Sequence, residues 1–295
     1  MRFEIVHQTV YRFHKPVELG EHRLMIRPRD SHDLRLVEAT LRIEPSASLR
    51  WVHDVFGNSI SLASFADRHQ RLSITSRLVI ERFARRPEAP EVDPRAARYP
   101  FVYDPSERLD LGATMAVEDE RSNDALQAWT ARFMAERRVG TLDLLTRMTT
   151  EIRDKFTYEA REAEGTRSAR ETLQRRSGSC RDFAMLLIEA SRFLGLGARF
   201  VTGYLYDPAL DRKAAARPDL ETRGAASTHA WAEIYLPGAG WIEFDPTNGT
   251  VASEDLIRVA VTRSPSQASP VSGTFVGSER DAAGLDVTVS VLAIP

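Results

Sequence analysis

Apolar and polar residues alternate over short runs along the first 85 residues, which is the pattern of half-buried β-strands. The runs are separated by Gly, Pro and Asn, with one turn signal at Gly57-Asn58. This spacing predicts an antiparallel β-sandwich domain over residues 1–85, with a barrel as the alternative. The expected strands cover residues 3–13, 34–43, 49–55, 60–65 and 72–83.

The pattern changes after residues 86–106, a proline-rich stretch that we interpret as a linker, because proline disrupts helix interiors and central strands. Residues 107–262 then combine helical and strand periodicities, and the chain as a whole is predicted to be α+β. Residues 263–295 read as a loop and one terminal β-strand. Within the middle part, helices are expected at 123–138, from 141, from 169 to 176 and at 181–194, strands at 198–206, 228–236 and 241–245, and a long polar loop at 207–226.

Charge and cysteine content exclude several classes of protein. The chain has 295 residues, with 40 basic and 42 acidic side chains, so binding of nucleic acid through bulk charge is not expected. No apolar run reaches the length of a membrane span, and the N-terminus lacks the apolar region of a signal peptide, so we expect a cytoplasmic protein with no membrane partner. One cysteine excludes an intramolecular disulfide, and no clustered metal-ligand spacing is present, so no metal or cofactor is expected.

The single cysteine, Cys180, follows Gly178-Ser179 at the start of the predicted helix over 181–194. Free N–H groups and the positive end of a helix favour a thiolate at this position, and the same N–H groups can bind a developing oxyanion. The alternative is a small buried side chain. The apolar stripe of the helix begins only after Cys180, which favours the reactive role.

A histidine and an aspartate follow on two neighbouring predicted strands. His229 lies in the alternating stretch 228–236, on the face opposite its small aliphatic residues, and Asp245 ends the next strand. A turn of three or five residues with direct pairing places His229 opposite Thr247 and diagonal to Asp245, about 7–8 Å away at Cα and within side-chain reach. A four-residue turn places them on opposite faces unless a bulge intervenes.

Together these residues supply a nucleophile, a base and an orienting carboxylate, in the chain order Cys180, His229, Asp245. A cysteine needs a base to become a thiolate, and a carboxylate fixes the imidazole tautomer so that the correct nitrogen faces sulfur. Each residue alone has an ordinary interpretation: a buried thiol, a structural histidine or an Asp-Pro turn. The combination is far more specific than any of its members.

The segments that carry these residues resemble the transglutaminase-like superfamily. The resemblance rests on GSCRDFAMLLIEASRFLGLGARFVTGYL and HAWAEIYLPGAGWIEFDPTNG, in that order. The earlier segments HQTVYRFHKPVELGEHRLMIRPR and DVFGNSI resemble the β-rich domain that precedes this core in bacterial members. The resemblance covers residues 1 to about 260 and is most specific over 172–249. It implies a papain-like core, with helices packed on a small antiparallel sheet, and the catalytic roles above for the three residues.

Five further residues are candidates for supporting roles. Gln174 lies six residues before Cys180, a spacing that resembles the oxyanion glutamine of papain, although a helix-surface residue is the interpretation we favour. Tyr158, Trp231 and Trp241 are candidates for lining a substrate groove, with aromatic core packing as the alternative. Asp182 is expected to cap the helix that begins near Cys180.

These observations favour a cysteine-dependent enzyme that attacks peptide or protein amides through an acyl-thioester intermediate. We expect a protease or amidase, in which water resolves the thioester. An amine acceptor, giving transglutaminase activity, is one alternative, and a non-catalytic peptide-binding or scaffold protein that kept the fold is the other. The substrate, the oligomeric state and the role of the N-terminal domain stay open.

Overall fold

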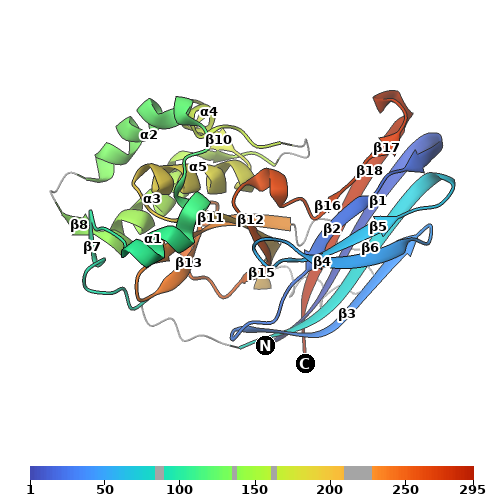
Figure 1. Ribbon diagram of the computed structural model, residues 1–295, viewed down its shortest axis with the longest axis horizontal. Helices are drawn as coiled ribbons and strands as arrows, with labels where there is room; N and C mark the ends of the chain where they lie inside the picture. The colour runs from blue at the N-terminus through green and yellow to red at the C-terminus, as the bar shows by residue number, and fades with distance from the viewer. Residues whose placement is uncertain (84–89, 135–137, 161–164, 209–227) are drawn as a thin grey trace.

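The computed structural model describes residues 1–83, 90–134, 138–160, 165–208 and 228–295. It consists of a β-sandwich and a separate unit in which helices cover a small sheet (Figure 1). The predicted α+β class, with a β-rich N-terminal part followed by a helix-and-sheet core, is therefore confirmed. Within these residues, no helix has both the length and the apolar character that crossing a membrane requires.

The sandwich is built from the strands that the alternation predicts. One sheet contains β3 (Leu34–Glu44), β6 (Arg68–Arg82) and β1 (Arg2–Leu19), and the other contains β4 (Ser48–His53), β5 (Ser59–Ser64) and β2 (His22–Arg27). Alternate apolar residues of β1 and β6 are buried between the sheets, as the period of two requires.

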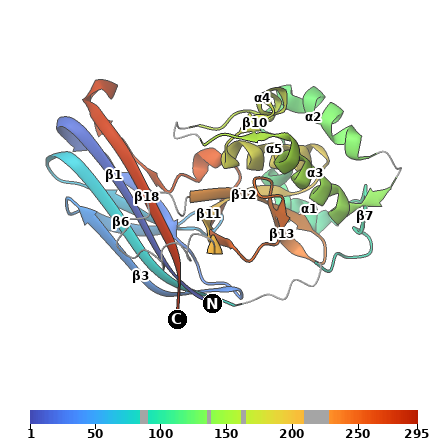
Figure 2. The same ribbon diagram turned by 180° about the vertical axis from the view of Figure 1, so that it is seen from behind.

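The end of the chain returns to complete this sandwich. Strand β18 (Ala282–Ile294) pairs antiparallel with β1 over nearly its whole length, from Arg2 opposite Ile294 to Phe13 opposite Ala282. Both views show the two ends of the chain side by side in one sheet (Figures 1 and 2). Two short strands, β16 (Val271–Ser272) and β17 (Phe275–Val276), also pair with the sandwich. The terminal strand thus belongs to the N-terminal domain, a pairing that the sequence pattern alone does not indicate.

The core sheet has the order β14-β13-β12-β11-β15, and helix α5 (Cys180–Phe193) covers one of its faces. Small and aliphatic residues of β12 lie in one hydrophobic cluster with α5, as the alternation predicts. The strands are β11 (Ala198–Leu205), β12 (Thr228–Leu236), β13 (Gly240–Asp245), β14 (Thr250–Val251) and β15 (Leu256–Thr262). The remaining helices are α1 (Pro105–Leu111), α2 (Asn123–Thr130), α3 (Thr141–Lys155) and α4 (Ala169–Arg175), and the short pairs are β7 (Arg98–Tyr99) with β8 (Val139–Gly140) and β9 (Thr157–Tyr158) with β10 (Ser177–Gly178).

Several boundaries differ from the sequence-based expectations. Helix α1 begins inside the predicted linker, because Pro105 occupies its first turn, where the missing N–H costs nothing. Strand β15 was not expected, and it extends the core sheet next to β11. Helix α2 ends at Thr130 and continues only as a 3₁₀ turn to Phe133, short of the predicted Arg138. Most of the loop expected at 207–226 lies outside the described residues.

Candidate active site

Cys180 is the first residue of α5 and is partly exposed to solvent. Ser179 is the N-cap, and a capping box joins it to Asp182, so the helix begins at Cys180 for a local chemical reason. The backbone N–H of Cys180 lies in the first helical turn, where no intrahelical acceptor exists. The sulfur therefore stands beside an N–H donor at the positive end of the helix.

Asp182 holds this turn in place, as the sequence predicts. Its carboxylate is fully buried and accepts hydrogen bonds from the N–H of Ser179 (2.9 Å), the hydroxyl of Ser179 (3.0 Å) and the N–H of Arg167 (2.7 Å). The loop before α4 and the start of α5 are thereby tied together. Gly178 is required here, because a Cβ at that position would lie 2.8 Å from the Cβ of Asp182.

We expect Asp182→Ala to lower the free energy of unfolding by roughly 1–3 kcal/mol, because buried donors lose a charged acceptor. Asp124→Ala is the matched control: Asp124 also lies in the first turn of a helix, α2, but is exposed, and its removal is expected to cost less than about 0.5 kcal/mol. Denaturant unfolding of both variants measures the difference. Equal losses would contradict the capping role.

His229 and Asp245 are brought together by a three-residue turn. Strands β12 and β13 pair with Leu236 opposite Gly240, which leaves residues 237–239 as the turn, one of the two lengths that the sequence analysis requires. The His229 Nε2 atom lies 2.8 Å from Asp245 Oδ2, and both side chains are buried. The predicted contact between strands is therefore present, and it needs no bulge.

Asp245 is held by its own turn as well as by His229. Its Oδ1 accepts the backbone N–H of Thr247 (2.9 Å) and Asn248 (3.3 Å), and its Oδ2 accepts the Asn248 side-chain amide (2.6 Å). Asn248 is not among the site residues predicted from the sequence. The signal was present in Asp245-Pro246-Thr247-Asn248, since an aspartate at a turn commonly accepts the N–H groups that follow it.

His229 also interacts with the side chain of Cys180. Burial lowers the pKa of His229, but hydrogen bonds and electrostatic interactions with Asp245 and with the side chain of Cys180 outweigh burial and raise that pKa to about 10. Burial also raises the pKa of Asp245, but its hydrogen bond to His229 and the charge of that ring reverse the effect and lower it. Since Nε2 contacts Asp245, the nitrogen that remains for the sulfur is Nδ1. The ring is therefore held between carboxylate and sulfur and retains its proton at neutral pH.

Tyr158 lies beside this group and faces solvent. It pairs with Gly178 in the short β9–β10 ladder, two residues before Cys180 along the chain, and it is 52% exposed. Burial of part of the ring raises the pKa of its hydroxyl, and the electrostatic interaction with Cys180 acts in the same direction. Tyr158 is therefore an exposed aromatic surface next to the sulfur.

Trp231 does not line a groove. Its side chain is fully buried, and its ring stacks on that of His229, with centroids 6.1 Å apart and an interplanar angle of 28°. The expectation was wrong because Trp231 lies in a second hydrophobic cluster, in which Val201 and Val261 of the neighbouring strands flank it and Phe56 packs against them.

Trp241, the other tryptophan expected to line a substrate groove, lies far from the candidate catalytic residues. It stands at the start of β13, and Asp245 stands at its end, so the two are separated by about 13 Å at the usual rise of a strand. Its ring packs against Tyr235 and lies under the guanidinium of Arg199, 4.1 Å from the ring centroid. Gln174 is exposed in the last turn of α4, which agrees with the helix-surface interpretation that we favoured.

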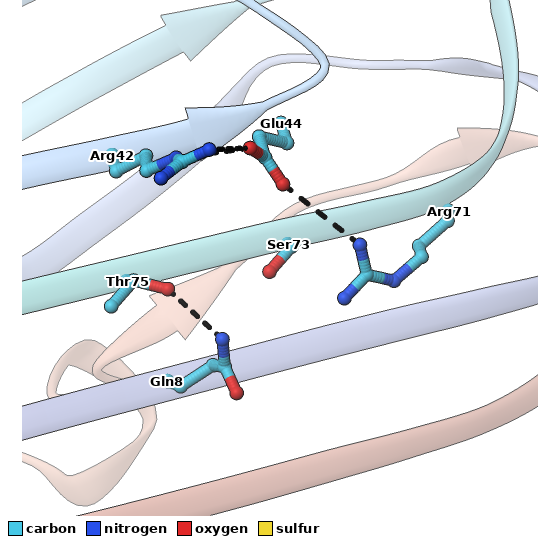
Figure 3. A pocket seen from close by; sticks show the side chains of 6 residues that line it. All are labelled: Gln8, Arg42, Glu44, Arg71, Ser73 and Thr75. Atoms are coloured by element: carbon cyan, nitrogen blue, oxygen red, sulfur yellow. Dashed lines mark hydrogen bonds and ion pairs between the residues drawn. The ribbon is translucent and has the colours of Figure 1, made fainter.

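Other polar groupings in the described residues offer no comparable chemistry. No cluster of three or more His, Cys, Asp or Glu side chains suited to a metal ion occurs among them. A hollow on the outer face of the N-terminal sheet is lined by polar side chains, and Glu44 there forms ion pairs with two arginines (Figure 3). Its six lining residues are Gln8, Arg42, Glu44, Arg71, Ser73 and Thr75, none of which is an activated nucleophile.

Two family models match the chain in the order of its two parts. Residues 3–81 match the bacterial transglutaminase-like N-terminal region, and residues 127–246 match the transglutaminase-like superfamily. The second match contains Cys180, His229 and Asp245.

Similar proteins extend over nearly the whole chain. An uncharacterized protein of Mycobacterium tuberculosis is 28% identical, covering 99% of this chain and 92% of the relative, and one of Mycobacterium leprae is 27% identical, covering 98% of each. A crystal structure from Cytophaga hutchinsonii, provisionally assigned as a cysteine protease, matches with a TM-score of 0.72 at 19% identity, covering 100% of this chain and 92% of that one. The two-part architecture is therefore a shared fold.

Proposed function

We propose, from the premise that this chain belongs to the transglutaminase-like superfamily, that it is a cysteine hydrolase that cleaves amide bonds in peptides or proteins. The observation that carries the proposal is the imidazole of His229, held at 2.8 Å by Asp245 and hydrogen-bonded to the side chain of Cys180. The assignment given to the Cytophaga hutchinsonii neighbour is consistent with this function.

The proposed reaction begins with the Cys180 thiolate paired with protonated His229. The sulfur attacks the amide carbonyl, and the backbone N–H of Cys180 stabilises the oxygen anion that develops. As the C–N bond breaks, the His229 proton passes to the leaving amine, and a thioester remains on Cys180. His229 then takes a proton from water, whose oxygen attacks the thioester, and the carboxylic acid and the thiolate are released.

Two features of the site support this sequence of steps. Asp245 fixes the ring so that one nitrogen serves the carboxylate and the other serves sulfur, which prevents the unproductive ring orientation. Tyr158 offers an exposed aromatic face next to the sulfur, and we propose that it contacts the acyl part of the substrate.

Alkylation of the full chain tests the thiolate directly. Cys180 is expected to react with iodoacetamide near neutral pH at least about 10-fold faster in the wild type than in His229→Ala, because the imidazolium stabilises the thiolate. The single cysteine makes the labelled site unambiguous by intact mass. Slow labelling that does not depend on His229 would favour the non-catalytic scaffold instead.

Mass spectrometry of the protein after incubation with a peptide library tests the intermediate. An acyl adduct on Cys180 that decays to free acid in water supports the hydrolase. An adduct that is stable in water but is discharged by added primary amine assigns transglutaminase activity. Fast alkylation without any adduct or cleavage of the peptides would contradict amide-bond chemistry.

A further inference from the structure

The ring of His229 stacks on the indole of Trp231, which is held without a side-chain hydrogen bond among the residues that the structure describes. Trp231 is fully buried beneath it, and within the described part of the chain its Nε1–H has no hydrogen-bond partner. Gly203, which pairs with His229 on the neighbouring strand, leaves room for this indole, because a Cβ there would lie 2.7 Å from the Trp231 ring. The position of Trp231 is therefore set by packing alone.

The packing around Trp231 includes a residue from the N-terminal domain. Its cluster contains Val201, Leu256 and Val261 from the core sheet, and Phe56 packs against them from the loop between β4 and β5. Phe56 of the N-terminal domain thus packs against the hydrophobic cluster of Trp231, on the strand β12 that also carries His229. The layer that supports the histidine is completed by the other domain.

The loop that presents Phe56 is ordered by its own hydrogen bonds. Asp54 Oδ1 accepts the backbone N–H of Phe56 (3.0 Å) and of Asn58 (2.9 Å), and Oδ2 accepts the Asn58 side-chain amide (2.8 Å). Gly57 has a φ of +74°, a conformation that a residue with a side chain rarely adopts. This loop is a preformed turn.

A pair of hydrogen bonds fastens the same loop to the core. The Asn58 amide donates from Nδ2 to the carbonyl of Val261 (2.6 Å) and accepts at Oδ1 from its N–H (3.0 Å), and the Asn58 side chain is buried. An amide that exchanges both bonds with one backbone residue acts like an extra paired strand residue. Since Val261 belongs to the Trp231 cluster, Asn58 fixes the layer that Phe56 completes.

We propose that residues 54–58 of the N-terminal domain position the catalytic imidazole, with Phe56 and Asn58 acting through Trp231 on His229. The inference rests on the proposed function, in which His229 activates Cys180. The ring must keep one nitrogen on Asp245 and the other on the sulfur at the same time. A displacement of about 1 Å in such a site can cost about 10²-fold in rate, so looser packing around Trp231 is expected to lower the reactivity of Cys180 strongly. The N-terminal domain is in this sense part of the catalytic apparatus.

The test measures the pH profile of Cys180 alkylation by iodoacetamide in full-length variants. Phe56→Ala and Asn58→Ala are expected to slow alkylation near neutral pH by about 10-fold or more and to move the profile toward that of His229→Ala. Phe56→Leu, which refills most of the space, is expected to recover the wild-type profile. General loss of stability alone would not move a pH profile in the folded protein.

Phe3→Ala is the matched control. Phe3 is also a phenylalanine of the N-terminal domain that contacts the core, with its ring 4.8 Å from that of Tyr206, but it belongs to a different hydrophobic cluster from Trp231. Its profile is expected to match the wild type, even where its melting temperature falls.

Two results would overturn the inference: wild-type profiles in both loop variants, or an equal shift in Phe3→Ala. If Phe56→Ala does not fold, Asn58→Ala decides. Failure of the premise that His229 activates Cys180 gives a different result, since the wild type itself would then alkylate slowly and without dependence on His229, whereas failure of amide cleavage alone would leave the alkylation profiles unchanged.

Discussion

Cys180→Ala is expected to abolish amide cleavage, lowering kcat/KM by a factor of about 10⁴–10⁶, because the atom that forms the thioester is removed. Backbone N–H groups of the first turn of α5 remain, so substrate binding should be weakened far less than turnover. A small residual rate is expected from these groups alone. Steady-state kinetics on the peptide substrate found in the library measures the loss.

Comparing His229→Ala and the double variant Cys180→Ala/His229→Ala with Cys180→Ala tests whether the two residues act together. When residues act as one unit, removing either costs about as much as removing both, so the double variant is expected to be no slower than Cys180→Ala. Cys180 is partly exposed, and its replacement by alanine should change the melting temperature little. If the losses of the two single variants multiply in the double variant, Cys180 and His229 do not act as one unit. If Cys180→Ala keeps more than about 1% of wild-type activity, other groups carry out the chemistry.

The contact between His229 and Asp245 could be predicted because the length of the turn fixes which residues of two paired strands lie opposite each other. A period of two places the residues on one face once the turn has an odd number of residues, and the three-residue turn at 237–239 sets that register, so the pair depends on local sequence and little on distant segments. The start of α5 at Cys180 was equally local, because Ser179 and Asp182 form a capping box within four residues.

The features that escaped prediction depend on segments that are distant in sequence. Trp231 was a candidate for lining a groove because its face of the strand lies opposite the small aliphatic residues, whereas Phe56, far away in the chain, packs against the cluster on that face. Strand β18 completes a sheet that begins at Arg2, and no pattern near residue 282 shows which strand it joins. Alternation predicts that a strand has two faces, but it does not say what lies against each of them.

Asp245→Asn is expected to lower kcat by about 10²–10⁴-fold and to narrow the pH range of activity from its alkaline side. In the wild type, the pKa of His229 is raised to about 10, which places the alkaline limit near that pH. The substitution removes the carboxylate charge while burial, which lowers this pKa, remains, so the limit moves down. Profiles of kcat/KM between about pH 5 and 11 measure the shift. Asn248→Ala, which keeps the carboxylate and removes one donor to it, should lose less activity and keep its alkaline limit near the wild-type value.

Asp245→Asn also tests how the His229–Asp245 pair contributes to stability, and the pKa shifts fix the direction in which that contribution changes with pH. The folded-state pKa of His229 lies above its ordinary value of 6.5, so its contribution is complete below about pH 6.5 and is lost as pH rises toward 10. The pKa of Asp245 is lowered from 3.8, so its contribution is present above that pH and is lost in acid. The pair therefore stabilises the fold most between pH 3.8 and 6.5. The melting temperature of Asp245→Asn should fall furthest below that of the wild type in this window, and the gap should close toward pH 10. A gap that does not vary with pH would mean that the ring carries no extra proton in the folded protein, and the imidazolium on which the proposed reaction depends would be absent.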